Sequence, residues 1–504
     1  MPHFKQLPME PTQIVMFPLS VDDSIPQDSD VRVFSEAMDM MDTSVLEAGY
    51  SEAGCPAYPP LILAKILAYG YSKGIRSSRA LEDTVKNDKR FVWLAGGLEP
   101  DHTTISRFRK EKQSQLKAAY TGTVRVCMQA GLVLLNATST DGTKILARAS
   151  KRSLYDAKRI DRVDEAIDRI FREAEEADRL EDEMYGSSSG REAPPELADA
   201  KRRKEKLGEI AKRLNESERK NVSSSDSECK VMKTSDGLRP AYNVQATVDS
   251  ANLVIVAADV TDAETDYGQL PEQLAQVAQN TGCRTGMALA DTGYGDQETL
   301  KELVSTGQEA LIPSLEQPQQ KDRNNLFASI CFLKAEGKGV LICPAGRELA
   351  YRREVSNHGK RYLVYTLEGC RSCSFYAQCV KLSCKTGKSV QKSAISEDRE
   401  KMIERLRSPE GKALYALRQQ TVEPTFGNIK VNMGFTRFGL HGKQGAMSET
   451  WLMCMAHNLK ILAARFRRAS LTEVFSCIAE TFGRRSAEWP TILHSKRSTG
   501  GITA

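Results

Sequence analysis

The stretch YALRQQTVEPTFGNIK (Tyr415–Lys430) combines more reactive side chains in one short segment than its surroundings do. Read as a helix, it places Glu423 and Lys430 on one face, with Arg418 within reach. A carboxylate suits a hard divalent cation, whereas the Arg fork and the Lys ammonium suit phosphate groups. The pattern suits phosphoryl chemistry on a polyanion, but a Glu–Lys pair on a helix is more often a solvated face, so the rest of the chain must decide.

Length and composition describe a globular chain with room for several cores. The 504 residues are 40% apolar and 27% charged, which is typical of two to four folded domains. No apolar run is long enough to span a bilayer and the start lacks a signal pattern, so we expect a cytoplasmic, nucleoid-associated protein without a membrane partner. Twelve cysteines in such a compartment do not predict a disulfide framework.

The charge is unevenly spread along the chain. The net charge is only +5, yet the sequence is locally basic at 107–112, 201–206 and 465–468. Basic clusters in a near-neutral chain fit a nucleic-acid partner, and each also fits an ordinary solvated helix face.

Residues 1–133 predict an N-terminal helical domain. Pro59 and Pro60 open an apolar helix, and a second helix follows in SRALEDTVKNDKRFVWLAGG. The last helix of this block is expected to begin with Arg107, Arg109 and Lys110, the position from which a helix would meet DNA. A surface helix with a basic first turn is the equal alternative.

From residue 134 the pattern changes to strands. The segments around 134–146, 242–250, 253–260 and 287–290 are rich in β-branched and apolar residues, and a helical pattern covers 267–282. Asp141 and Asp291 are each expected where a strand ends, and side-by-side strands would bring them together. Two adjacent carboxylates require something positive between them.

Two insertions interrupt this second domain, which runs over 134–465. Residues 155–221 predict an antiparallel helical hairpin, through the seam of Ile160, Val163 and Ile167, with a structural, DNA-contacting or dimer-forming role. Residues 314–400 are Cys-rich. Four thiolates are the ligands that tetrahedral zinc takes, and four small buried thiols are the alternative. The candidate ligands are Cys343, Cys370, Cys373 and Cys379, with Cys384 as a rival for the fourth place.

The C-terminal helix is expected to pack in the core. Trp451, Leu452, Met455 and Leu459 form an apolar stripe, and His457 fits a hydrogen-bonded core histidine better than a metal ligand. Residues 466–504 are expected to form a tail.

The motifs DGTKILARAS around Asp141, GLRPAYNVQATVD, LADTGYG around Asp291 and TVEPTFGNIK around Glu423 resemble those of DDE transposases of bacterial insertion sequences. The resemblance covers roughly residues 20 to 465. It implies a mixed α/β fold: a ribonuclease H-like mixed sheet with flanking helices, preceded by an all-helical domain and interrupted by the hairpin and the Cys-rich insertion. The chain has four residues between Arg418 and Glu423 where many relatives have three.

The resemblance also implies a mechanism. Asp141, Asp291 and Glu423 would hold Mg²⁺ or Mn²⁺, Lys430 would hold a phosphate, and Arg418 and Tyr415 would position the flanking backbone or an extruded base. The partners implied are the element's terminal inverted repeats and target DNA, bound by a homodimer. A nuclease of the same core that does not join strands, or an inactive DNA-binding remnant, are the alternatives.

Overall fold

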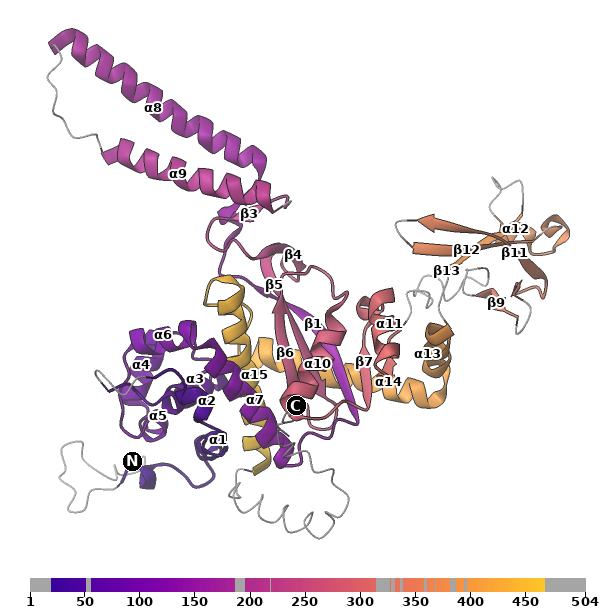
Figure 1. Cartoon of the computed structure of the whole chain (residues 1–504), viewed down its shortest axis with the longest axis horizontal. Helices are drawn as coiled ribbons and strands as arrows, with labels where there is room; N and C mark the ends of the chain where they lie inside the picture. The colour runs from indigo at the N-terminus through magenta and orange to yellow at the C-terminus, as the bar shows by residue number, and fades with distance from the viewer. Residues whose placement is uncertain are drawn as a thin grey trace, which may run out of the picture.

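A mixed α/β body lies at the centre of the protein, with a group of helices beside it and two extensions that leave it on separate sides (Figure 1). The structure is a computed structural model and describes residues 20–466 except 51–55, 186–194, 218, 314–326, 328–330, 336–338, 358–359, 368, 381–386 and 394–396. The expected tail lies outside the described residues from 467 onward. Within the described ranges, no helix is long and apolar enough to cross a membrane.

The N-terminal part is helical, and three of its helices begin at capping side chains. Ser77 accepts a hydrogen bond from the N–H of Ala80, and Asp88 and Asp101 cap the two helices that follow. The single helix expected over 78–97 is therefore two, because Asp88 adopts an extended backbone and starts a new one. The helices are α1 (Asp30–Asp39), α2 (Ser44–Glu47), α3 (Pro60–Ser72), α4 (Ser78–Asn87), α5 (Lys89–Leu94), α6 (His102–Glu111) and α7 (Gln113–Gln129).

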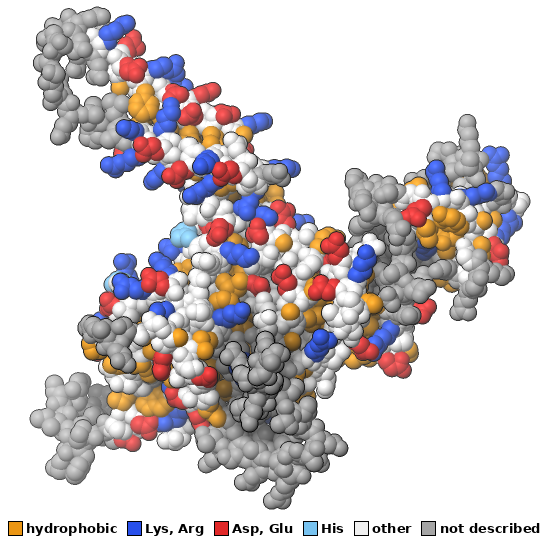
Figure 2. Space-filling view, viewed as in Figure 1, with side chains coloured by type: hydrophobic (Ala, Val, Ile, Leu, Met, Phe, Trp, Pro, Cys, Tyr) orange, Lys and Arg blue, Asp and Glu red, His pale blue; other side chains and the backbone are white. Residues whose placement is uncertain are grey.

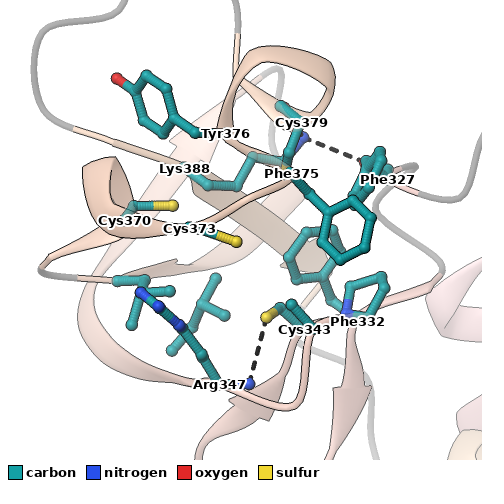
Figure 3. A pocket seen from close by; sticks show the side chains of 14 residues that line it. Phe327, Phe332, Cys343, Arg347, Cys370, Cys373, Phe375, Tyr376, Cys379 and Lys388 are labelled. Carbon is teal, nitrogen blue, oxygen red and sulfur yellow. Dashed lines mark hydrogen bonds between the residues drawn. The ribbon is translucent and has the colours of Figure 1, made fainter.

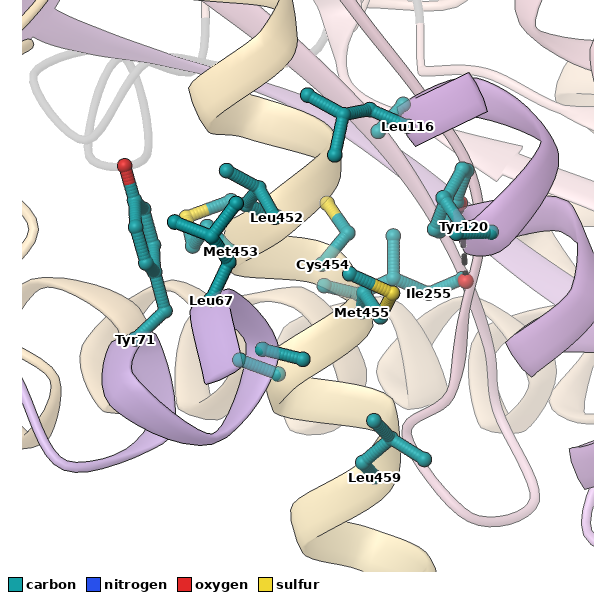
Figure 4. Packing of buried hydrophobic residues seen from close by; sticks show 14 of the residues in the cluster. Leu67, Tyr71, Leu116, Tyr120, Ile255, Leu452, Met453, Cys454, Met455 and Leu459 are labelled. Carbon is teal, nitrogen blue, oxygen red and sulfur yellow. Dashed lines mark hydrogen bonds between the residues drawn. The ribbon is translucent and has the colours of Figure 1, made fainter. Parts of the chain in front are cut away.

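Helix α15 (Gly442–Phe466) runs through the middle of the core, between the N-terminal helices and the sheet. It packs on α1, α3 and α7 and on strand β6. Figure 4 shows Leu452, Met455 and Leu459 of α15 among side chains of α3, α7 and β6. These three residues are fully buried, which confirms the core role expected for the apolar stripe.

Five polar residues of α15 are also buried, and two of them, His457 and Asn458, bond to the backbone around the start of β6. The Asn458 amide donates to the carbonyl of Ile255 and accepts from its N–H, both at 2.9 Å, so it completes the backbone bonding of β6. His457 Nε2 lies 3.0 Å from the Leu253 carbonyl, and burial lowers the pKa of His457 to about 4. His457 is thus a neutral core histidine, as its sequence context indicated.

The central sheet mixes antiparallel and parallel strands. β1 pairs antiparallel with β5 and parallel with β7, β5 pairs antiparallel with β6, and β7 pairs parallel with β8. β4 extends the sheet beside the first half of β5. The strands are β1 (Ala137–Leu146), β4 (Lys230–Thr234), β5 (Gly237–Asp249), β6 (Ile255–Thr261), β7 (Met287–Ala290) and β8 (Ala310–Leu311).

Three further helices flank this sheet. α10 (Gln269–Thr281) packs on β5 and β6, α11 (Gln297–Ser305) follows β7, and α14 (Pro409–Gly427) packs chiefly on β1. Ser408 caps α14 by accepting from the N–H of Gly411 at 3.0 Å, and Pro409 occupies the first turn. The start of α14 requires glycine at 411, because a Cβ there would lie 1.8 Å from the Arg405 carbonyl oxygen.

The two extensions correspond to the expected insertions. α8 (Ala157–Tyr185) and α9 (Pro195–Glu216) pack on each other through Ile167, Ala200 and Leu207, and β2 (Leu154–Tyr155) pairs with β3 (Val222–Ser223) at their base. Figure 2 shows cationic and anionic side chains interspersed along this hairpin. The second extension holds β9 (Leu333–Lys334), β10 (Leu341–Ile342), β11 (Glu348–Asn357), β12 (Lys360–Thr366), α12 (Tyr376–Cys379) and β13 (Ser389–Ser393). The next helix, α13 (Glu397–Arg407), is back in the central body, where it packs on α14 and β8.

Candidate active site

Asp141 lies in the middle of β1, and not at a strand end as the sequence predicted. Asp-Gly is a common turn pair, but here β1 is paired on both sides, with β5 through Asp141↔Ala246 and with β7 up to Thr140. The Asp141 carboxylate accepts a hydrogen bond from the Gly142 N–H at 2.9 Å. Strand pairing therefore fixes the backbone that carries this carboxylate.

Asp291 follows directly after β7 and starts a single 3-10 turn, Thr292–Tyr294. Its Oδ1 accepts from the Gly293 N–H at 2.8 Å. Because Thr140 and Ala290 are partners in the parallel β1–β7 pair, the next residue on each strand, Asp141 and Asp291, stand side by side. The strand order expected from the sequence brings these two carboxylates to one place.

Arg418, from the flanking helix α14, supplies the positive charge between them. Its Nη2 lies 3.0 Å from Asp141 Oδ2 and 3.9 Å from Asp291 Oδ2. The Arg418 side chain is 15% exposed, and its buried Nε has no hydrogen-bond partner in the described part of the chain. The guanidinium thus occupies the position that the carboxylate pair would otherwise offer to another cation.

Tyr415 and Lys430 complete the surroundings of this pair. Tyr415, one turn before Arg418, is half-buried, and burial raises its pKa while the hydrogen-bonded Arg418 opposes that rise. Burial lowers the pKa of Lys430, and the negative charge of Asp141 works against that shift. A half-buried ammonium near Asp141 suits contact with a phosphate group.

Glu423 stands apart from this cluster. It is exposed on α14, and its Oε2 accepts a hydrogen bond from Gln419 at 3.4 Å. The helix contains Pro424 and then widens into a π-helical turn, Asn428–Asn432, so the seven-residue spacing to Lys430 no longer keeps both side chains on one face. The regular-helix reading of this stretch is therefore wrong at its C-terminal end.

The described residues contain no group of three or more His, Cys, Asp or Glu close enough to hold a metal ion. The two strand carboxylates meet at Arg418, and Glu423 lies outside that contact.

The surroundings of Asp141 disfavour the charged form of its carboxyl group. Burial is the largest cause that raises its pKa to about 6; Arg418 opposes the rise, and the negative charges of Asp291 and Asp266 add to it. The native state therefore binds the Asp141 proton more tightly than the unfolded chain does, whose Asp pKa is about 3.9. Below both pKa values Asp141 is protonated in the native and the unfolded state, so it costs the native state nothing. Above pH 6 it is ionised in both states, and the full cost of burying its charge lowers the free energy of unfolding.

We therefore expect Asp141 to make the metal-free protein less stable as pH rises from about 4 to about 6, by up to roughly 3 kcal/mol. Thermal unfolding in EDTA, followed over pH 4 to 7 for wild type and Asp141→Asn, measures this. The Asn variant lacks the titrating group, so the difference in melting temperature between the two proteins should grow across that window. Parallel curves would show that Asp141 titrates normally.

Asp266 is a residue at this site that the sequence reading missed. It lies in the connection between β6 and α10, and its Oδ1 accepts hydrogen bonds from Asn243 Nδ2 and Gln245 Nε2, both at 2.7 Å. Lys144 Nζ is 3.8 Å from the same oxygen. In the sequence, Asp266 is marked only by the acidic segment TDAETD (261–266) after a predicted strand. Acidic residues before a helix are common, so this segment alone does not indicate a site.

Cysteines of the second extension line one small cavity. Cys343, Cys370, Cys373 and Cys379 share it with Phe332, Phe375 and Lys388, as Figure 3 shows. Burial raises the pKa of Cys379, and the other three thiols add to that rise. Cys384 lies outside the described residues. The thiols share a cavity without forming a closed ligand set among the described residues, so the zinc site stays a prediction.

The basic residues proposed to meet DNA divide into two kinds. They lie in the second half of α6, with Arg109 and Lys110 in its last turn, and not at the start of the last helix, since a further helix begins at Gln113. Arg107 and Lys110 are exposed. Arg109 is 6% exposed and donates to the Tyr71 hydroxyl and the Arg76 carbonyl, so its burial argues against the expected contact with DNA.

Comparisons with known proteins give matches to two parts of the chain. The family model described as a transposase DDE domain matches residues 342–463, which include α14, and a second one, a transposase domain of the DUF772 type, matches residues 19–111. No curated protein matches. A solved structure titled as a piggyBac transposase synaptic complex with hairpin DNA is 10% identical, with 92% of this chain and 82% of that chain covered and a TM-score of 0.29. These two family matches support a DDE-type transposase of an insertion element.

Proposed function

We propose that this transposase hydrolyses a DNA strand at each terminal inverted repeat of its element and then uses the freed 3′-hydroxyl to attack target DNA. The observation that carries the proposal is the convergence of Asp141 and Asp291 on one cation, the Arg418 guanidinium, at 3.0 and 3.9 Å. The sheet order, three antiparallel strands followed by two parallel ones, supports a ribonuclease H-like core.

Asp141 and Asp291 offer two carboxylates to a divalent metal ion, and the described residues place no third acidic ligand close to them. Two carboxylates already bind a cationic group between them, and the raised pKa of Asp141 indicates that this charge is incompletely neutralised. Asp141 and Asp291 would hold Mg²⁺ or Mn²⁺, with Glu423 as the third ligand that the resemblance implies. When bound, such ions activate the attacking oxygen and stabilise the leaving oxygen at phosphorus.

The chain's own cations supply the rest of the chemistry. Lys430 would hold a phosphate beside the cut, where partial burial strengthens its interaction with negative charge. Arg418, once displaced from the carboxylates, would grip the flanking backbone through its planar fork, and Tyr415 would support it one turn away. Exposed Arg107 and Lys110 would hold duplex DNA, and two copies of the chain would bring two element ends together.

The test is cleavage of a labelled duplex that carries the element's own ends, in Mg²⁺, Mn²⁺ or EDTA. Wild type is compared with Glu423→Ala and with Glu410→Ala, a matched exposed Glu at the start of the same helix. Metal-dependent nicking that is lost only in Glu423→Ala supports the proposal. Binding without cleavage in every protein contradicts it and points to a DNA-binding remnant.

A second substrate separates transfer from simple hydrolysis. Duplexes that already end in the free 3′-hydroxyl are incubated with supercoiled target DNA. Joined products support a strand transferase. Cleavage without joining in this assay would identify a nuclease of the same core.

A further inference from the structure

Asp266 lies beside the carboxylate pair, next to the glycines that follow Asp141 and Asp291. Its Oδ1 is fixed by the two amides of β5, and a Cβ built on Gly142 would lie only 2.5 Å from that oxygen. The Asp266 carboxylate therefore rests directly on the backbone of the residue that follows Asp141. Glycine at 142 is what leaves room for it.

The second oxygen of Asp266 turns toward Asp291. A Cβ built on Gly293 would lie 2.9 Å from Asp291 Oδ1 and 3.5 Å from Asp266 Oδ2, so both oxygens surround the same point. Within the described part of the chain, no hydrogen bond to Asp266 Oδ2 is found. The side chain is 21% exposed, which leaves this oxygen open to a ligand.

An unsatisfied acceptor lies in the same place. The Asn243 side chain is fully buried, and its Oδ1 has no hydrogen-bond partner among the described residues. The amide cannot be turned over, because its nitrogen donates to Asp266 and an oxygen there would meet the carboxylate. Asn243 Oδ1 is thus a buried acceptor without a donor, close to Asp266 and to the glycine that follows Asp141. A cation, or a water molecule bound to a cation, would satisfy it.

We propose that Asp266 is an additional acidic residue of the metal site, whose Oδ2 binds a water of the divalent cation held by Asp141 and Asp291. This rests on the proposed function. Asn243 and Gln245 orient the carboxylate, and the charge of Asp266 adds to the negative field at Asp141. Asp266 thus increases the affinity of the site for metal before DNA arrives.

The first experiment measures Mn²⁺ binding to the full-length, DNA-free protein by electron paramagnetic resonance titration. Asp266→Asn is the informative variant, because its carbonyl oxygen still accepts from both amides while the charge is removed. Asp262→Asn is the matched control: it lies in the same connection and pairs with Arg219 and Lys230 instead. We expect about a tenfold or greater loss of Mn²⁺ affinity in Asp266→Asn, none in Asp262→Asn, and a loss in Asp141→Asn.

The outcomes distinguish the two proposals. Wild-type affinity in Asp266→Asn together with lost affinity in Asp141→Asn would overturn the role of Asp266 and leave the proposed function standing. Wild-type protein that binds no Mn²⁺ would overturn both.

A second measurement does not depend on the variant's fold. Wild-type protein is loaded with Fe²⁺ and ascorbate, so that hydroxyl radicals cut the backbone close to the bound ion, and Mg²⁺ is added as competitor. Cuts near Asp266 as well as near Asp141 and Asp291, all suppressed by Mg²⁺, support the proposal. Cuts at the two strand carboxylates that spare Asp266 would overturn it.

Discussion

Asp141→Asn is expected to reduce strand cleavage at the element ends by about a thousandfold or more, because a metal ion contributes several kcal/mol to a phosphoryl-transfer transition state. The change is nearly isosteric. It removes the charge from one of the two carboxylates that converge on Arg418. Asp291→Asn should give an equal loss. Rates of nicking on labelled duplexes measure both.

The control for these variants is DNA binding. Mobility shifts with the same duplexes should remain close to wild type, since neither Asp is proposed to contact DNA directly. Lys430→Met serves as the graded comparison: it removes one charged contact to phosphate and should slow cleavage by about ten- to a hundredfold. Near-normal cleavage in either Asp variant would remove that residue from the site.

The proximity of the two strand carboxylates could be predicted because it follows from local patterns. Apolar runs identify the strands, and the parallel pairing of β1 with β7 then places Asp141 beside Asp291. The role of Arg418 follows less directly, since it depends on how α14 lies across β1. The prediction that Glu423 and Lys430 lie on one face of a regular helix was wrong because Pro424 and the π-helical turn change the helical period.

Asp266 could not be predicted because its environment is assembled from distant segments. Its orientation depends on Asn243 and Gln245, on the glycine at 142 and on the turn that carries Gly293. None of these residues marks Asp266 in the sequence. A pattern of residue types indicates a site only when the contacts that complete it are local.

The burial of Arg109 could not be predicted for the same physical reason, because its partners come from distant segments of the chain. A basic helical turn looks alike in sequence whether it faces solvent or the core. Its charged partner, Glu449, is on α15, far along the chain, and the pair is separated by 3.7 Å. Glu449 is fully buried and accepts hydrogen bonds from the Tyr71 hydroxyl at 2.8 Å and from the N–H groups of Gly439 and Leu440.

Arg109→Ala is therefore expected to destabilise the protein by about 3–5 kcal/mol, because it leaves the buried Glu449 charge without its cation. The network joins the N-terminal helices to α15, so the loss should appear as an earlier melting of that part of the molecule. Scanning calorimetry of the full chain measures it. Double replacement, Arg109→Met with Glu449→Leu, should recover part of the stability, since no buried charge then remains unpaired.

Two comparisons decide whether Arg109 acts through the core or through DNA. Tyr71→Phe keeps both charges and removes the hydroxyl that bonds to each of them, so it should cost less than the loss of the cation, about 1.5–3 kcal/mol. Arg107→Ala with Lys110→Ala removes the exposed cations of the same turn, and should weaken DNA binding and reduce its salt dependence without shifting the melting temperature. If Arg109→Ala instead weakened DNA binding and left the melting temperature unchanged, Arg109 would be a DNA contact and the buried pair with Glu449 would contribute little. The burial of Arg109 and its hydrogen bonds to Tyr71 and Arg76 favour the first result.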